Sequence, residues 1–123
     1  MIFRIILPGP KCNRPIGMEN GKIRNQQLSA SSQWDTNHGA RLGRLNRKRT
    51  GRLAGAWCAK VGNHHQWFQV YLGRPMKFTG VATQGRSDYN QWVTKYLLSY
   101  SLDGANFATY WSQGRPWVSS SVV

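Results

Sequence analysis

Two runs of apolar residues that recur at every second position constrain the fold of this 123-residue chain more than any other feature. The alternating positions are Phe68, Val70 and Leu72 in the first run, and Tyr96, Leu98, Tyr100 and Leu102 in the second. A period of two is the pattern of a β-strand with one buried face. We therefore predict two strands, with all of these side chains except Leu102 facing the interior.

Turn signals divide the rest of the chain into further short strands. Asp103-Gly104 is a hairpin signal that closes the second run, and 107–111 is the expected partner strand. Residues 78–84 are predicted to form another strand after a turn at 73–75. The chain carries 13 glycines and no helical periodicity between these segments. The pattern predicts one all-β domain, an antiparallel β-sandwich.

The two ends of the chain differ from its middle. Residues 1–11 contain Pro8 and Pro10 and are predicted to form an extended lead-in. The apolar stretch Ile2–Leu7 is shorter than the apolar core of a secretory signal, and it contains Arg4. Residues 117–123 continue no strand pattern and are expected to be an atypical tail, so the domain itself is placed at residues 12–116.

Positive charge is the dominant bulk property, with 17 Lys and Arg against four acids and a net charge of +13. Six of these cations fall between residues 41 and 52 with no acid among them: Arg41, Arg44, Arg47, Lys48, Arg49 and Arg52. Such a field attracts nucleic acid, acidic glycans or anionic lipid head groups. A solvated basic loop that binds nothing is the alternative.

Catalysis and metal binding are not expected. The four carboxylates (Glu19, Asp35, Asp88 and Asp103) provide no acid–base pair, and no nucleophile stands at a recognisable spacing from a histidine. His64 and His65 are adjacent, so on a strand they would point to opposite faces. The sequence therefore predicts no catalytic residue, no metal site and no cofactor.

Trp34 stands in a polar loop with Asp35, Asn37 and His38. A tryptophan at a loop tip can insert into a membrane interface or stack on a sugar ring. It can also fold back over the end of a sandwich. The sequence alone does not decide between these two positions of Trp34.

Several blocks, in this order, resemble the discoidin domain, the C-type domain of coagulation factors V and VIII. The blocks are Cys12-x-x-Pro15-Ile-Gly-Met-Glu-Asn-Gly21 with Lys22-Ile23, Leu28-Ser-Ala-Ser-Ser32-x-Trp34, Arg44-Leu-Asn46, Ala56-Trp57, Gln66-Trp-Phe-Gln-Val-x-Leu-Gly73, Thr79-Gly-Val-Ala-Thr-Gln-Gly-Arg86, Trp92-Val-Thr-x-Tyr96 and Tyr100-Ser-x-Asp-Gly104 with Phe107. Their order and spacing are together highly specific.

The resemblance implies a jelly-roll, galactose-binding-like β-sandwich whose loops at one end bind the ligand. It also implies an extracellular, secreted or cell-surface, adhesion module. Its partners would be an anionic phospholipid membrane, acidic or neutral glycans, or a matrix or receptor protein. The residues at the matching loop positions are Trp34, Asp35, Asn37, His38, Arg41, Arg44, Arg47, Lys48, Arg49, Arg52, Arg86, Asp88 and Tyr89.

The sequence departs from the family pattern at its cysteines and its C-terminus. The family's closing cysteine, which would pair with Cys12, is absent, and the sandwich is expected to be incomplete at the C-terminus. Cys58 is not at a bridging position of the family. Two rival hypotheses remain: a basic intracellular nucleic-acid-binding protein, and a truncated product without independent function.

Overall fold

A computed structural model describes residues 4–6, 14–78, 80–116 and 118–120. It divides into two compact units, residues 1–92 and 93–123. Every strand pairing among the described residues is antiparallel, so the predicted all-β class is confirmed. None of the helices in this part of the chain is long and apolar enough to cross a bilayer.

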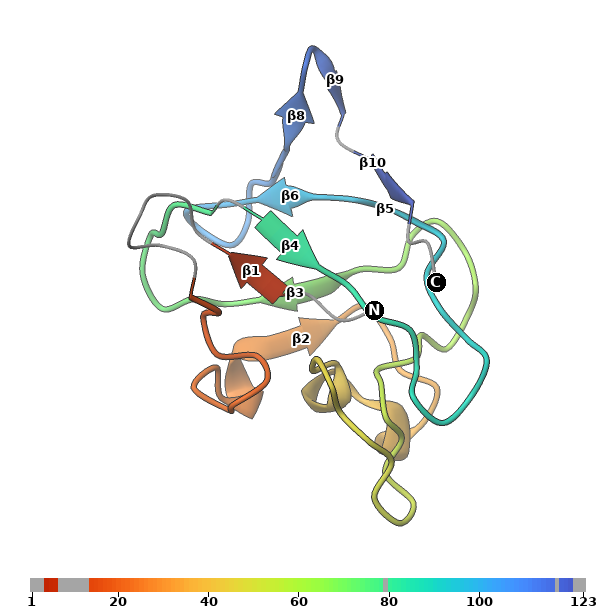
Figure 1. The fold of residues 1–123 in the computed structure, drawn as a ribbon. Helices are drawn as coiled ribbons and strands as arrows, with labels where there is room; N and C mark the ends of the chain where they lie inside the picture. The colour runs from red at the N-terminus through yellow and green to blue at the C-terminus, as the bar shows by residue number, and fades with distance from the viewer. Residues whose placement is uncertain (1–3, 7–13, 79, 117, 121–123) are drawn as a thin grey trace. The chain divides into compact units, whose positions relative to one another are not determined.

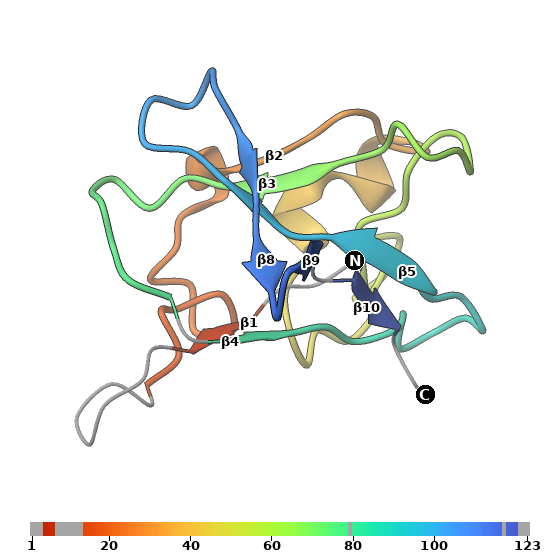
Figure 2. The ribbon, with the colours of Figure 1, turned by 90° about the horizontal axis from the view of Figure 1, so that it is seen from above.

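The first unit contains two strand pairs and three single-turn 3₁₀ helices. Its elements are β1 (Arg4–Ile6), η1 (Asn25–Gln27), β2 (Leu28–Ala30), η2 (Thr36–His38), η3 (Ala40–Leu42), β3 (Phe68–Val70) and β4 (Gly80–Ala82). β1 pairs with β4, and β2 pairs with β3, placing Leu28 opposite Val70. Figure 2 shows the two pairs as separate layers of this unit.

The core of the first unit is drawn from segments far apart in the sequence. Its buried apolar side chains are Met18, Ile23, Leu28, Leu42, Ala54, Ala56, Trp57 and Phe68. The Trp57 and Phe68 rings lie 5.5 Å apart between centroids, and the Trp57 indole N–H donates to the carbonyl of Ser32 at 2.8 Å. Burial of two large rings is among the largest apolar contributions to a small core.

The second unit is built of three two-stranded ribbons. β5 (Lys95–Leu97) pairs with β10 (Val118–Ser120), β6 (Ser99–Tyr100) with β7 (Ala108–Thr109), and β8 (Trp111–Ser112) with β9 (Arg115–Pro116). The predicted hairpin at Asp103-Gly104 is present, because residues 101–107 connect β6 to β7 and Gly104 has a φ of +75°. The Asp103 carboxylate accepts from the backbone N–H groups of Ala105 and Asn106, which closes the turn.

The predicted core faces are only partly correct. Phe68 is buried, and Val70, Leu72, Tyr96 and Leu98 are half-buried. Tyr100 was predicted to face inward, but it is 54% exposed. In a two-stranded ribbon, each strand forms backbone hydrogen bonds along one edge only, and the faces that carry the side chains stay uncovered. Alternation of apolar residues along a strand therefore does not by itself bury them.

The two ends of the chain also differ from expectation. Within the predicted lead-in, Arg4–Ile6 is a strand paired with β4. Within the predicted tail, Val118–Ser120 pairs with β5, so these residues do continue a strand pattern. Backbone hydrogen bonding needs no particular side chain, which is why a serine run concealed this strand. Cys12 and its predicted loss of a partner lie outside the described residues.

Candidate ligand-binding loops

Three loops of the first unit contain all of the predicted binding residues except Arg41, which lies in η3. The first loop, residues 31–39, follows β2; the second loop comprises residues 44–53; and the third loop, residues 84–92, follows β4. In Figure 1 the second loop forms the lowest point of this unit, with η2 and the third loop above it on the same side. The fold therefore gathers the three loops at one end.

The bases of these loops are joined by hydrogen bonds through residues 54–58. Ala54 N–H donates to Asn37 O at 3.0 Å and Cys58 N–H to His38 O at 3.1 Å, which ties this segment to the first loop. Gly55 N–H donates to the Asp88 carboxylate at 3.1 Å, which ties it to the third loop. Because backbone groups make most of these bonds, the loops have a fixed common base.

Trp34 is presented outward at the first loop. Its backbone N–H donates to Cys58 O at 2.8 Å, whereas its side chain is 64% exposed. The backbone is thus held while the indole ring remains in solvent. A large exposed aromatic side chain with a fixed backbone is typical of a binding anchor.

Asp35 and His38 stabilise the turn that carries Trp34. The Asp35 carboxylate caps η2 by accepting from Asn37 N–H at 2.8 Å, and it lies 2.6 Å from His38 Nδ1. The hydrogen bond with His38, followed by that with Asn37, lowers the pKa of Asp35 below its ordinary value. These contacts show that the three residues stabilise the turn. That Asp35, Asn37 and His38 also contact a ligand stays a prediction.

The second loop carries the exposed cations. Thr50 and Leu53 exchange two backbone hydrogen bonds of 3.0 Å, and Gly51 supplies the positive φ of +58° that the tight turn requires. Lys48, Arg49 and Arg52 are exposed at this turn. Arg47 is half-buried and its Nε lies 3.4 Å from Ala54 O. Three cations on one turn produce a concentrated positive potential.

Arg44 does not belong to this exposed set, contrary to the prediction from the sequence. It is only 9% exposed, and its guanidinium donates to Met18 O at 2.9 Å, Asn25 Oδ1 at 2.8 Å and Arg41 O at 3.1 Å. Burial, and to a smaller extent Arg47, lowers the pKa of Arg44. Buried polar groups need hydrogen-bond partners of this kind. Arg44 therefore stabilises the fold by connecting the segments that carry these three acceptors.

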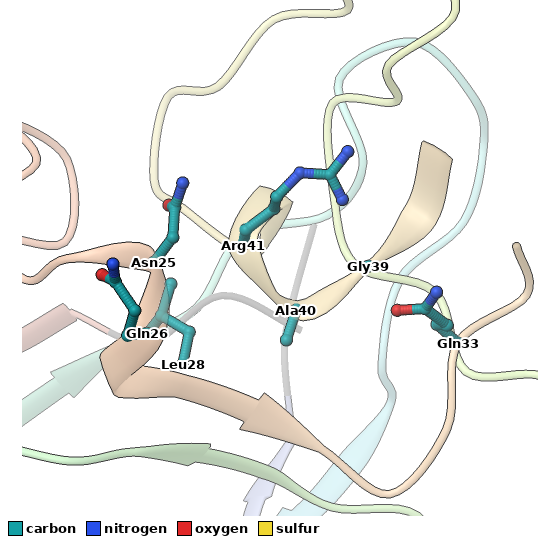
Figure 3. A pocket seen from close by; sticks show the side chains of 7 residues that line it. All are labelled: Asn25, Gln26, Leu28, Gln33, Gly39, Ala40 and Arg41. Atoms are coloured by element: carbon teal, nitrogen blue, oxygen red, sulfur yellow. The ribbon is translucent and has the colours of Figure 1, made fainter. Parts of the chain in front are cut away.

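Arg41 is also withdrawn from the loop tips. It is half-buried in η3, and its Nη1 donates to Thr36 O at 2.9 Å. Its guanidinium instead lines a pocket beside β2, together with Gln33 and Gly39 (Figure 3). The spacing of charges along the sequence does not distinguish Arg41 and Arg44 from the exposed cations of the second loop. Those exposed cations are Lys48, Arg49 and Arg52.

The third loop is organised by Arg86. Its guanidinium donates to the Asp88 carboxylate at 2.9 and 3.0 Å and to Gln91 Oε1 at 3.1 Å. It also lies 5.3 Å from the centre of the Tyr89 ring, whose side chain is 66% exposed. Arg86 holds the pKa of Asp88 at about 2. The charges of Arg86 and Asp88 neutralise each other, so the exposed Tyr89 side chain is the group of this loop that is available to a ligand.

Cys58 is a free thiol in this structure. Its Sγ is half-buried, 3.9 Å from Arg86 Nη1, and burial is the main cause that raises the pKa of the thiol. Among the described residues, no three His, Cys, Asp or Glu side chains come together as a metal site would require.

Sequence comparison identifies the architecture to which these loops belong. The sequence model of the F5/8 type C domain matches residues 27–120. Human EGF-like repeat and discoidin I-like domain-containing protein 3 is 38% identical over 111 residues, which is 85% of this chain and 22% of that protein. Rat lactadherin is 37% identical over 111 residues, covering 84% of this chain and 25% of lactadherin. Bovine coagulation factor V is 38% identical over 105 residues, 80% of this chain and 5% of factor V.

The chain therefore spans a quarter or less of the length of these curated relatives. The matched segment contains all three loops, together with β2, β3 and β4. The order of motifs, the antiparallel strands and the relatives agree: the chain belongs to the F5/8 type C, or discoidin, family of β-sandwich domains.

Proposed function

We propose that this chain is a non-catalytic extracellular binding module that attaches to anionic phospholipid surfaces through the tips of its three loops. One observation carries the proposal: two exposed aromatic side chains, Trp34 and Tyr89, and a turn with three exposed cations lie on loops that share a hydrogen-bonded base. The three cations are Lys48, Arg49 and Arg52.

The chemistry of a lipid surface matches both kinds of side chain. Tryptophan and tyrosine prefer the interface between water and acyl chains, where an apolar ring and a polar group are both accommodated. Each Lys or Arg near an anionic leaflet contributes about 1 kcal/mol of attraction. Three cations then contribute about 3 kcal/mol, or about a hundredfold in affinity.

The fixed base of the loops supports the same function. A loop that is already ordered loses little conformational entropy when it binds. Trp34, Tyr89 and the second loop are each held at the backbone by contacts that do not involve their exposed groups.

The test is binding to vesicles of phosphatidylcholine with and without phosphatidylserine, measured at low and high salt. We expect binding only with phosphatidylserine, and a steep loss of affinity with salt. Replacing Lys48, Arg49 and Arg52 by Gln should weaken binding about a hundredfold.

The matched control removes three exposed charges elsewhere, by replacing Lys22, Arg74 and Lys77 with Gln. These residues flank the opposite end of the β2–β3 pair. Equal losses in the two triple variants would indicate attraction by net charge alone and would contradict a loop-tip site. Tight binding to a defined DNA sequence would favour the nucleic-acid hypothesis instead.

A further inference from the structure

The tip of the second loop is an uninterrupted run of exposed residues. Lys48, Arg49, Thr50, Gly51 and Arg52 are all exposed, and three of them are cations. In Figure 1 this loop projects from the lower edge of the first unit. Exposed loop tips with small or polar residues are the preferred places at which proteases cut folded proteins. The tip is therefore accessible to a protease that selects cations.

The tip is held by a turn within itself. Thr50 and Leu53 exchange two backbone hydrogen bonds of 3.0 Å, and Arg49 Nε donates to Gly51 O at 2.9 Å. Among the described residues, the hydrogen bonds printed by the structure for 48–53 all stay within this turn. A protease binds its substrate as an extended segment, so the turn must open before it is cut. Opening it breaks a few local hydrogen bonds and no core contact, which is the kind of local unfolding that costs little.

Contacts with the rest of the unit begin on both sides of the tip. Before it, Arg47 O accepts from Ser87 Oγ at 2.9 Å. After it, Ala54 N–H donates to Asn37 O at 3.0 Å. The tip can therefore open while its two ends stay attached to the fold.

Proline protects half of the other places where an arginine is exposed. The exposed arginines of the described residues are Arg14, Arg24, Arg49, Arg52, Arg74 and Arg115. Proline follows directly after Arg14, Arg74 and Arg115. Proteases of the trypsin type do not cut before proline, because its ring removes the N–H and fixes φ. Arg24 and the two arginines of the second loop remain.

The surroundings of Arg24 and Arg52 are less accessible than those of Arg49. Arg24 follows the buried Ile23, and its backbone N–H and C=O are both hydrogen-bonded to Gln27. Arg52 is followed by a half-buried residue and then by the buried Ala54. Arg49 has exposed neighbours on both sides, so a protease can reach the residues that flank its peptide bond.

We propose that the Arg49–Thr50 peptide bond is a processing site for a serine-type protease whose specificity pocket contains a carboxylate. This carboxylate pairs with the Arg49 guanidinium through two parallel hydrogen bonds. Hydrolysis breaks the amide bond and adds one water molecule, which leaves a carboxylate on Arg49 and an ammonium group on Thr50. The cleavage itself does not depend on lipid binding.

The cleaved chain keeps its fold, because both strand pairs of the first unit join one fragment to the other. Residues 1–49 contain β1 and β2, and residues 50–123 contain β3 and β4. Cleavage does separate Lys48 and Arg49 from Arg52. It therefore weakens attachment to anionic lipid, a consequence that rests on the proposed function.

The test is digestion of the whole chain with a limiting amount of trypsin, followed by mass spectrometry. We expect the first products to be residues 1–49 and 50–123, which separate in denaturant but elute together from a sizing column under native conditions. A first cut at any other bond would overturn the assignment of the site. Fragments that elute separately would contradict the retention of the fold.

Variants test the chosen bond. Arg49→Gln should slow the first cut at least about a hundredfold, since the specificity pocket then loses its charged partner. Thr50→Pro keeps every cation and should also block the cut, as proline does after Arg14. Arg24→Gln removes the same charge from another exposed position and should be cut at the parent rate. Loss of intact Arg49→Gln chain at the parent rate would show that Arg49 is not the residue selected.

Vesicle binding distinguishes this proposal from the proposed function. The cleaved chain should bind phosphatidylserine vesicles about tenfold more weakly than the intact chain, because its two free ends lose conformational entropy that the closed turn has already lost. Equal binding of the two forms would contradict the release from lipid. If the intact chain is cut at Arg49 but does not bind vesicles, the cleavage site stands and the lipid function is wrong.

Discussion

The guanidinium of Arg86 and the carboxylate of Asp88 form two parallel hydrogen bonds, 2.9 Å from Nε to Oδ1 and 3.0 Å from Nη2 to Oδ2. Both side chains are largely shielded from solvent. The same carboxylate accepts from Gly55 N–H, and the same guanidinium lies over Tyr89. One ion pair therefore shapes the third loop and attaches it to the segment that supports the first loop.

The ion pair predicts a pH dependence of stability. The pKa of Asp88 is about 2 in the folded chain, against an ordinary value of 3.8. A carboxyl group whose pKa is lowered by folding stabilises the native state fully above its ordinary pKa. That stabilisation is lost as the pH falls from about 4 to about 2. Asp88→Asn should lower the unfolding temperature at pH 7, and the difference from the parent chain should shrink towards pH 2.

The measurement is thermal unfolding of both chains across this pH range. A difference that stays constant from pH 7 to pH 2 would mean that the Asp88 charge contributes nothing beyond the shape of the side chain.

Trp34 and Trp57 should respond in opposite ways to truncation. Trp34 is 64% exposed, whereas Trp57 is buried against Phe68. Trp34→Ala should leave the free energy of unfolding within about 0.5 kcal/mol and reduce vesicle binding. Trp57→Ala should cost about 3–5 kcal/mol. Urea unfolding and vesicle sedimentation measure the two effects; a loss above about 3 kcal/mol for Trp34→Ala would identify this residue as a cap on the fold.

Arg44 and Arg49 provide a second contrast between a structural cation and a surface cation. Arg44→Ala removes the donors to Met18 O, Asn25 Oδ1 and Arg41 O, and should cost about 2–4 kcal/mol. Arg49→Ala should change stability by less than about 0.5 kcal/mol and weaken vesicle binding at low salt. Urea unfolding measures the free energy of unfolding of each variant. Equal values for the two variants would contradict the predicted contrast.

The absence of a side chain at Gly55 is predicted to be essential for the position of the third loop. A Cβ at Gly55 would lie 2.2 Å from Ser87 Oγ, 3.0 Å from Asp88 Oδ1 and 3.1 Å from Arg47 O. Gly55→Ala should therefore displace this loop, lower the unfolding temperature and weaken vesicle binding through Tyr89. Gly62→Ala is the control, because a Cβ there meets nothing within 4 Å. Similar unfolding temperatures for the two variants would show that the loop tolerates the displacement.

The class of fold was predictable from the sequence, and so was the position along the chain of the three loops that we propose as ligand-binding. Alternation around Phe68, the Asp103-Gly104 turn and the order of motifs are local signals, and each depends on neighbours in the chain. The family assignment used the same signals. The sequence does not determine whether Trp34 is exposed, since a single loop residue carries no information about what covers it.

Only the tertiary structure decided which charges are available to a ligand. Arg44 and Arg49 are both arginines of one basic run, yet Arg44 is buried among three acceptors and Arg49 lies on an exposed turn. The difference depends on Met18 and Asn25, residues about 20 positions or more away along the chain. The pocket beside Gly39 is likewise formed by η1, β2 and η3 together. Local sequence patterns determine how a segment bends and which face is apolar, but burial and hydrogen bonding depend on contacts between distant segments.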